Sequence, residues 1–431
     1  MLCEIESNIS CYEPLVVAIG PFHHGKQKLQ PMEKYKAKLA FQFADQESKY
    51  VGVSSRLLTN SVSKDEIYIR VKNIVPNVRE CYAEDLIKDY NDEEFVQMMF
   101  VDGCFILQYI ICFVSGNIKQ LHMKITDIAL IRRDLFLLEN QLPFEVLQVL
   151  MTYKFNKDEG MKMIKQFISS SHVSPPQEHG FIHRIKDFFG GGGGDPFSPE
   201  TTNGKGQDPE RPAHLLELLR THLIDPKAFL EGRCYLRGEW CSYRSAMELR
   251  RAGIHFTRGK GRLLSDIKFK SFDCTALLTL PLITIDDSTK SELLNLAAYE
   301  ACPDTPDDFS VTSYLCFMDS LNDHPEDVKE LRSKGILLNL LRTDQEVTNL
   351  FKEIAKELVP NPRAFVDMKY KIEIQCSSKG KVWIAEWKNT HFITPWTFFT
   401  FIVAIFIIGL QVTDTVLSSI QTYYAVHEKR S

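Results

Sequence analysis

The stretch FVQMMFVDGCFILQYIICFV, residues 95–114, decides the fold because it is the most apolar internal segment of this 431-residue chain. It is long enough to suggest a membrane span, but Asp102, Gly103 and Gln108 interrupt it. We therefore expect a pair of helices at the centre of a globular core, and not a second transmembrane segment.

Helical spacing of apolar residues continues on both sides of this stretch. MEKYKAKLAFQFADQ, from Met32, has an apolar and a charged side, and DIALIRRDLFLLENQLPFEVLQVLMTYKF follows at residue 127. In the second of these, the triplet 139–141 is predicted to end one helix, and Pro143 suits the first turn of the next. Helical patterns return after residue 211 and again after residue 290.

A short region of different character lies between those later helices. A helix is predicted to stop at Gly253, after which IHFT, DIKFKSF and ALLTLPLITID have the alternation and β-branched content of strands. We expect two or three antiparallel strands here. The fold class is therefore mainly α: a helical globular domain with a small antiparallel β element and one carboxyl-terminal transmembrane helix.

Composition shifts divide the chain into five parts. Residues 169–212 are rich in Gly, Pro and Ser, with five consecutive glycines, and are expected to form a flexible insertion because they contain little apolar surface to bury. The predicted parts are a helical part (1–168), the insertion (169–212), a part with helices and the β element (213–388), a transmembrane helix (389–413) and a tail (414–431).

Charge and cysteine content narrow the class of protein. A formal net charge of -5, with 44% hydrophobic and 25% charged residues, is typical of a globular protein and gives no broad attraction to nucleic acid. The 11 cysteines are odd in number and include no CxxC pair, which favours buried free thiols in a reducing compartment over a disulfide framework or a zinc site.

The carboxyl-terminal region has the composition of a membrane span. Residues 389–413 contain no Asp, Glu, Lys or Arg, and tryptophans at 383, 387 and 396 and tyrosines at 423 and 424 flank the apolar run. The amino terminus shows no signal peptide, so insertion after translation with the large domain in the cytosol is the default expectation. The sequon at Asn8 would carry a glycan only in the opposite orientation.

One motif resembles a phosphate-binding loop. Residues 12–19 are strand-like, and Gly20 to Lys26 have the spacing GxxxxGK. However, Pro21 lacks an N–H for the phosphates, and Gln27 stands where a hydroxyl is required to hold magnesium. We interpret the loop as a structured turn and expect no nucleotide binding.

Other residues that could carry chemistry are scattered. His23 and His24 lack further ligands at metal-binding spacing, so no metal or other cofactor is expected. Four carboxylates lie within apolar helical stretches and could form an acid/base set: Asp102, Glu139, Glu300 and Asp319. Such groups more often cap helices or bond to neighbouring helices, so we assign no catalytic residue.

Several motifs in order resemble one plant family. The chain contains GPFHHG at 20–25, DGCFIL at 102–107, LLENQLPF at 137–144, LLNLAAYEAC at 293–302 and TPWTFF at 394–399. This combination is similar to the plant domain of unknown function 247 family, also called uncharacterised protein family 0481. The resemblance implies a single-pass membrane protein without an assigned activity or known catalytic residues, some of whose relatives are linked to self-incompatibility in grasses.

Two functions from different classes follow. The first is a membrane-anchored recognition or scaffold protein, not an enzyme, that binds another protein or peptide; the plasma membrane is one candidate location. The alternative is a membrane-anchored hydrolase or transferase with an unrecognised acidic site, which requires a pocket that gathers several of the histidines and carboxylates named above.

Overall fold

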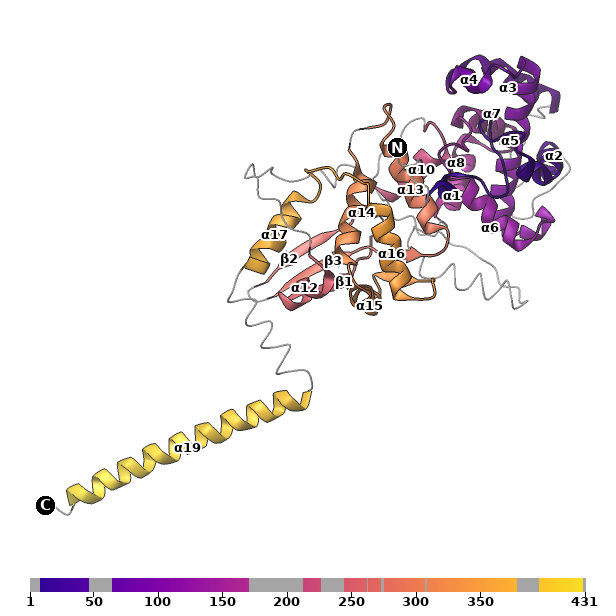
Figure 1. The fold of residues 1–431 in the computed structure, drawn as a ribbon. Coiled ribbons are helices and arrows are strands. Elements are labelled where there is room, and N and C mark those ends of the chain that lie inside the picture. Colours follow the sequence, from indigo (N-terminus) through magenta and orange to yellow (C-terminus); the bar gives the residue numbers. More distant parts are fainter. Residues whose placement is uncertain are drawn as a thin grey trace.

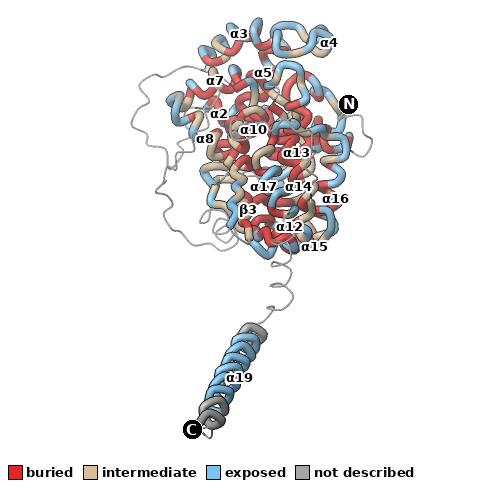
Figure 2. Tube along the Cα trace, turned by 90° about the vertical axis from the view of Figure 1, so that its left-hand side faces the viewer, coloured by how far each residue is buried: buried red, intermediate tan, exposed pale blue. Residues whose placement is uncertain are grey.

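The computed structural model describes residues 8–45, 64–169, 212–225, 244–261, 263–272, 275–306, 308–377 and 395–428. The expected insertion at 169–212 lies outside the described residues except for its two ends. Within the described ranges the chain is mainly helical with a small β element, as predicted, and its buried residues form one continuous apolar core beneath an exposed surface (Figure 2).

The amino-terminal helices gather around α5 (Asp92–Val114), drawn in indigo and purple in Figure 1. Two short 3-10 helices, η2 and η3, lie among them. The elements are α1 (Ile9–Tyr12), η2 (Gln27–Leu29), α2 (Gln30–Ala44), α3 (Lys64–Glu80), α4 (Glu84–Ile87), η3 (Ile118–Leu121), α6 (Ile125–Asp134), α7 (Phe144–Lys154) and α8 (Lys157–Ser169).

Helix α5 is one continuous helix, so the expected pair was wrong. It starts at a capping box, in which the Glu94 N–H donates to the Asn91 side chain (2.9 Å) and the Asn91 N–H donates to the Glu94 carboxylate (3.2 Å). Gly103 does not break the helix; it lets α7 approach closely, because a Cβ atom there would lie 2.4 Å from Leu150 Cδ1. The most apolar window of α5 is 89% buried, which agrees with a core helix.

The second half of the body combines helices with two small sheets. The helices are α10 (Leu215–Leu223), α12 (Ala246–Arg251), α13 (Thr289–Glu300), α14 (Ser310–Leu321), α15 (Pro325–Ser333), α16 (Asp344–Ala355) and α17 (Val366–Ser377). The strands are β1 (Ile254–Arg258), β2 (Lys268–Ser271), β3 (Ala276–Leu280), β4 (Ile283–Ile285) and β5 (Leu337–Asn339).

The sheets are not purely antiparallel, which corrects one detail of the expectation. Strand β3 lies between β1, to which it is parallel, and β2, to which it is antiparallel. Strand β4 pairs in parallel with β5. The stretch that contains β5 was expected to be helical. Strand β3 takes the centre because it is the most buried of the three, while β2 presents mostly exposed residues and forms an edge.

Helix α19 (Pro395–Glu428) lies apart from this body (Figures 1 and 2). Its segment Phe399–Gln421 is long and apolar enough to cross a bilayer, and none of its most apolar window is buried against the rest of the chain. The helix begins six residues after the start of the expected span and continues 15 residues beyond its end.

Candidate functional site

The segment between α1 and the loop at Gly20 is held by side chains and not by strand pairing. The fully buried carboxylate of Asp134, at the end of α6, accepts hydrogen bonds from the N–H groups of Leu15 (3.0 Å), Val16 (2.7 Å) and Val17 (3.1 Å). The expected strand at 12–19 was therefore wrong: a carboxylate takes the place of a neighbouring strand as the hydrogen-bond acceptor.

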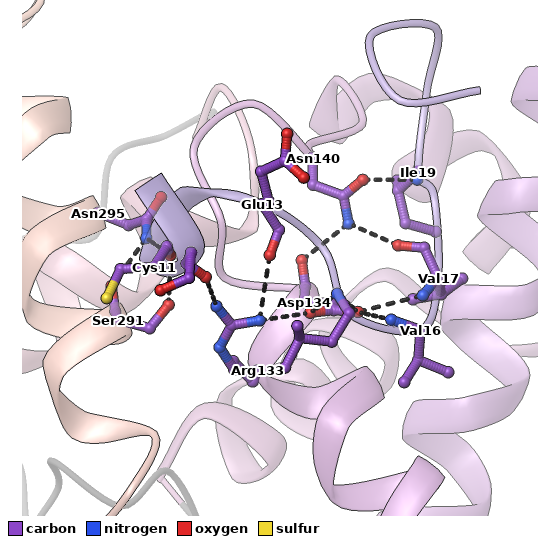
Figure 3. Close-up of polar contacts among 12 residues, drawn as sticks. Cys11, Glu13, Val16, Val17, Ile19, Arg133, Asp134, Asn140, Ser291 and Asn295 are labelled. Carbon is purple, nitrogen blue, oxygen red and sulfur yellow. Dashed lines mark hydrogen bonds and ion pairs between the residues drawn. The ribbon is translucent and has the colours of Figure 1, made fainter. Parts of the chain in front are cut away.

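Two further buried side chains continue this pattern. Asn140 accepts a hydrogen bond from the Ile19 N–H (2.7 Å) and donates one to the Val17 carbonyl (3.1 Å) (Figure 3). Its side-chain amide thus makes the two kinds of hydrogen bond that the backbone of a neighbouring strand would make. One residue further on, the Gly20 N–H donates to Asp102 (2.9 Å). The backbone of residues 13–20, which we call the pinned segment, is thus fixed by groups from α5, α6 and the α6–α7 connection.

Asp102 also forms a buried ion pair. Lys36 on α2 lies 2.6 Å from the Asp102 carboxylate, both side chains are 1% exposed, and the ammonium donates to the Ala18 carbonyl (2.9 Å). Burial acts to lower the pKa of Lys36, but Asp102 and Glu33 outweigh it and raise that pKa. Asp102 therefore bonds to a neighbouring helix, which is one of the two roles expected for the four carboxylates.

Arg133 links the pinned segment to α1. Its guanidinium donates to the carbonyls of Ser10 (2.6 Å) and Glu13 (3.2 Å) and pairs with the carboxylate of Asp134 (3.0 Å) (Figure 3). Helix α13, in the other half of the body, also holds α1, because the side chains of Ser291 (2.5 Å) and Asn295 (3.0 Å) both donate hydrogen bonds to the Cys11 carbonyl.

Asn295 also joins α13 to the α6–α7 connection, because its side-chain oxygen accepts from the Leu138 N–H (2.8 Å). We call this set the pinning network: Lys36, Asp102, Arg133, Asp134, Asn140, Ser291 and Asn295. Apart from Asp102, the sequence patterns did not identify these as functional residues. The available signal was limited to polar residues such as Asp102 and Asn295 inside otherwise apolar stretches.

The loop at residues 20–26 is held by its own turn and by ion pairs to the pinned segment. Gly20 (φ +68°) and Gly25 (φ +79°) adopt left-handed conformations that disfavour other residues, and the His23 carbonyl accepts the Lys26 N–H (3.3 Å). The ammonium groups of Lys26 (3.1 Å) and Lys28 (2.6 Å) both bind Glu13 and lower the pKa of its carboxyl to about 2. Lys26 is therefore already paired with a carboxylate.

The two histidines have separate surroundings. His23 is 1% exposed, and neither ring nitrogen has a hydrogen-bond partner in the described part of the chain. Burial, reinforced by Lys26, lowers the pKa of His23 to about 4, so the imidazole is neutral at pH 7. The His24 ring packs edge-on against Tyr90. Among the described residues, no three His, Cys, Asp or Glu side chains are placed to hold a metal ion.

Glu139 belongs to the same neighbourhood. Its side chain is exposed, but partial desolvation by the surrounding protein raises the pKa of its carboxyl; Lys26 acts against this rise, while Glu13 adds to it. The structure thus brings two residues from different motifs, Glu139 and Lys26, within electrostatic range of each other. We call Glu13, His23, Lys26, Lys28 and Glu139 the charged cluster.

The remaining carboxylate candidates serve other contacts. Glu300 binds Arg220 (2.8 Å) and accepts the N–H groups of Val311 and Thr312 (both 2.9 Å), so it caps the start of α14. Asp319 on α14 is half-buried, and burial raises the pKa of its carboxyl, with Lys352 opposing.

A small cavity lies between α6 and α13. Its volume of about 10 Å³ holds roughly one water molecule. It is lined by Ala129, Arg132, Arg133, Phe136, Ser288 and Glu292, so it gathers none of the histidines or carboxylates proposed from the sequence.

Together these features define a helical body with a small β element, a side-chain-pinned amino-terminal segment and an exposed apolar carboxyl-terminal helix. The chain belongs to the DUF247 family, described as plant protein of unknown function, whose model matches residues 3–410. The predicted resemblance is thereby confirmed.

Two similar proteins are known from Arabidopsis thaliana. The UPF0481 protein At3g47200 is 29% identical over 95% of this chain and 84% of its own length. The UPF0481 protein At3g02645 is 22% identical over 97% of this chain and 90% of its own length. No solved structure matches the chain.

Proposed function

We propose that this chain is a single-pass membrane protein whose large domain recognises or scaffolds another protein or peptide. The observation that carries the proposal is α19, whose apolar segment Phe399–Gln421 is unburied by the body that precedes it. At about 1.5 Å per residue, its 23 residues extend roughly 34 Å, enough for a hydrocarbon layer of about 30 Å. An apolar helix of this length needs either lipid or protein around it.

The orientation proposed is the default one, with the large domain in the cytosol, and the plasma membrane is one candidate location. The Asn8 side chain is 2% exposed, so an oligosaccharyl group could reach it only with local rearrangement. Glycan found at Asn8 in plant cells would refute this orientation.

Removal of the anchor tests the first half of the proposal. A chain that ends before Thr394 should move from a carbonate-resistant membrane fraction to the soluble fraction. A chain shortened only after Glu428 keeps all of α19 and serves as the matched control. Equal fractionation of the two chains would contradict the anchor.

The recognition role is supported by the rigidity and surface of the amino-terminal segment. The pinning network holds its backbone, yet Ile9, Leu15 and Phe22 remain 40–47% exposed. A preorganised segment loses little conformational entropy on binding, and exposed apolar side chains beside charges are typical of a contact surface. Tethering also raises the effective concentration toward partners at the same membrane.

A photo-crosslinking residue at position 22 tests this surface. Position 41 is the matched control, because Phe41 on α2 is also an exposed phenylalanine, at 63% against 40%. In plant membranes, position 22 should yield one product that excess unlabelled domain competes away, while position 41 should not. Identical products from both positions, or a signal that excess domain does not reduce, would contradict the proposal.

The charged cluster favours a second candidate function, a membrane-anchored hydrolase or transferase. The Glu139 carboxyl, with a raised pKa, and the neutral His23 imidazole both lie within electrostatic range of Lys26 and Glu13, and acid/base catalysis uses groups of these two kinds. We expect no turnover from the purified protein and nucleotide affinity at background both before and after Lys26→Ala. Turnover lost in Glu139→Gln, or saturable ATP binding lost in Lys26→Ala, would favour the enzyme.

A further inference from the structure

Between Phe399 and Gln421, the amide and carboxyl side chains of α19 (Gln411, Asp414 and Gln421) fall on one line along the helix. Alternating spacings of four and three residues keep side chains on one face and define the seam of a left-handed coiled coil. The seam positions are Thr400, Ala404, Ile407, Gln411, Asp414, Ser418 and Gln421. The opposite face is formed by large apolar residues such as Ile405 and Phe406.

Asp414 lies deep in the proposed span. It is the only Asp, Glu, Lys or Arg between Lys388 and Glu428, and it follows Phe399 by 15 residues, or about 22 Å of helix. Seven more uncharged residues come between Asp414 and Thr422. Ionisable side chains at such depth are strongly disfavoured unless they face protein or water.

The polar residues away from the seam are satisfied by the helix itself. The hydroxyl groups of Thr413, Thr415 and Ser419 donate to the backbone carbonyls four residues earlier, at 2.7–2.8 Å. A side-chain amide or carboxyl has more hydrogen-bonding atoms to satisfy. Both the Gln411 and the Asp414 side chain are exposed, and no residue in the described part of the chain binds either of them, so each needs a polar partner if it lies within the bilayer.

We propose that α19 pairs with α19 of a second copy of this chain, as a parallel dimer along the seam. The inference rests on the proposed anchor. Parallel copies place each seam residue opposite its equivalent. A carboxamide both donates and accepts, so Gln411 is complementary to itself. Asp414 faces its own equivalent across the same seam, one turn further along the helix.

A basic residue in the span of another protein is the competing occupant. It would bind Asp414 but would not by itself explain why Gln411 and Gln421 follow the same line. A symmetric pair uses all three positions, and therefore the second copy is the occupant that the pattern favours.

Neighbouring serines provide a sharp test of the seam. The purified full chain is placed in phosphatidylcholine vesicles, and Ser418→Cys, on the seam, is compared with Ser419→Cys, off it. Under mild oxidation, Ser418→Cys should form a disulfide-linked dimer beyond that of the unsubstituted chain, whose own 11 cysteines set the background. Equal crosslinking of the two variants would overturn the seam.

Energy transfer between labelled copies in the same vesicles measures the strength of pairing. Gln411→Leu and Asp414→Leu should each weaken dimerisation about 3- to 30-fold, the range for one interhelical hydrogen bond. Thr413→Val, at the same depth but off the seam, should leave it unchanged, and Asp414→Asn should preserve it. Association that none of the seam substitutions weakens would overturn the inference.

Failure of the inference and failure of the anchor give different results. A chain that resists carbonate extraction but stays monomeric in pure vesicles overturns only the inference, whether or not another membrane protein with a basic span later binds it. A chain that carbonate removes from the vesicles overturns the anchor and the dimer together.

Discussion

Asp134 offers the most direct test of how the amino-terminal segment is held. Its carboxylate accepts from three consecutive backbone N–H groups and from Arg133, and it is fully buried. Asp134→Asn keeps the size of the side chain but replaces one acceptor oxygen with a donor NH₂ group. With the amide oxygen in the place of Oδ2, the three backbone N–H groups keep their acceptor, and the NH₂ group faces the Arg133 guanidinium in the place of Oδ1.

The magnitude follows from these contacts. Leaving a buried donor unsatisfied costs about 1–3 kcal/mol, and in the Asn variant the Arg133 guanidinium loses both this acceptor and the negative charge that it faces. We expect Asp134→Asn to lower the free energy of unfolding by about 2–4 kcal/mol. Asp134→Ala removes every acceptor and should cost more, about 4 kcal/mol or above, a large part of a total of roughly 5–15 kcal/mol.

Urea titration with brief proteolysis suits this measurement, because it reads the folded fraction of the full chain in detergent without interference from α19. Asp158→Asn is the matched control, since Asp158 is exposed in the first turn of α8 and should shift stability by no more than about 0.5 kcal/mol. In Asp134→Ala, hydrogen exchange should show lost protection at the amides of residues 15–17. A stable Asp134→Ala variant with those amides still protected would refute the account of the pinned segment.

Three further changes test other parts of the core. His23 is protonated below about pH 6.5 when unfolded but only below about pH 4 when folded, so stability should fall as the pH drops through this window, by up to about 3 kcal/mol. His23→Gln should remove that share of the pH dependence, and an unchanged pH profile would count against it. Gly103→Ala should cost about 1–3 kcal/mol in urea titrations, because the new methyl group meets the Leu150 side chain of α7 at 2.4 Å; a neutral result would mean that this side chain adjusts without cost. Arg220→Met leaves Glu300 buried without its cation and should cost about 3–5 kcal/mol, whereas Arg70→Met at an exposed pair should cost less than about 1 kcal/mol. Equal effects of these two arginine changes would contradict the role of burial.

Local patterns in the sequence predicted many of the elements. Helical spacing from Met32 corresponds to α2, Gly253 (φ +82°) follows the end of α12 as expected, and the alternation around Phe269 marks β2. These features depend on neighbouring residues along the chain, whose effects on helix ends and strand faces act within a few positions. The apolar segments near residues 95–114 and 399–421 were also evident from composition alone.

Composition could not by itself distinguish these two segments. Both are apolar helices of span length, yet the most apolar window of one is 89% buried and that of the other is not buried at all. Polar interruptions at Asp102 and Gln108 indicated the difference correctly, but the same reasoning wrongly divided α5 into two helices. Gly103 faces α7, and a helix tolerates glycine where close packing compensates for its cost.

The sequence by itself therefore determined the helical class, the family and the apolar helix at the carboxyl end. Tertiary structure alone decided that residues 13–20 bind side chains instead of a strand, and that Glu139 lies near Lys26. Asp134 and Asn295 act on backbone groups 117 or more residues away, and nothing in the local pattern specifies such a distance. Local propensity acts along the chain, whereas buried hydrogen-bonding groups must be satisfied by whatever the fold places beside them.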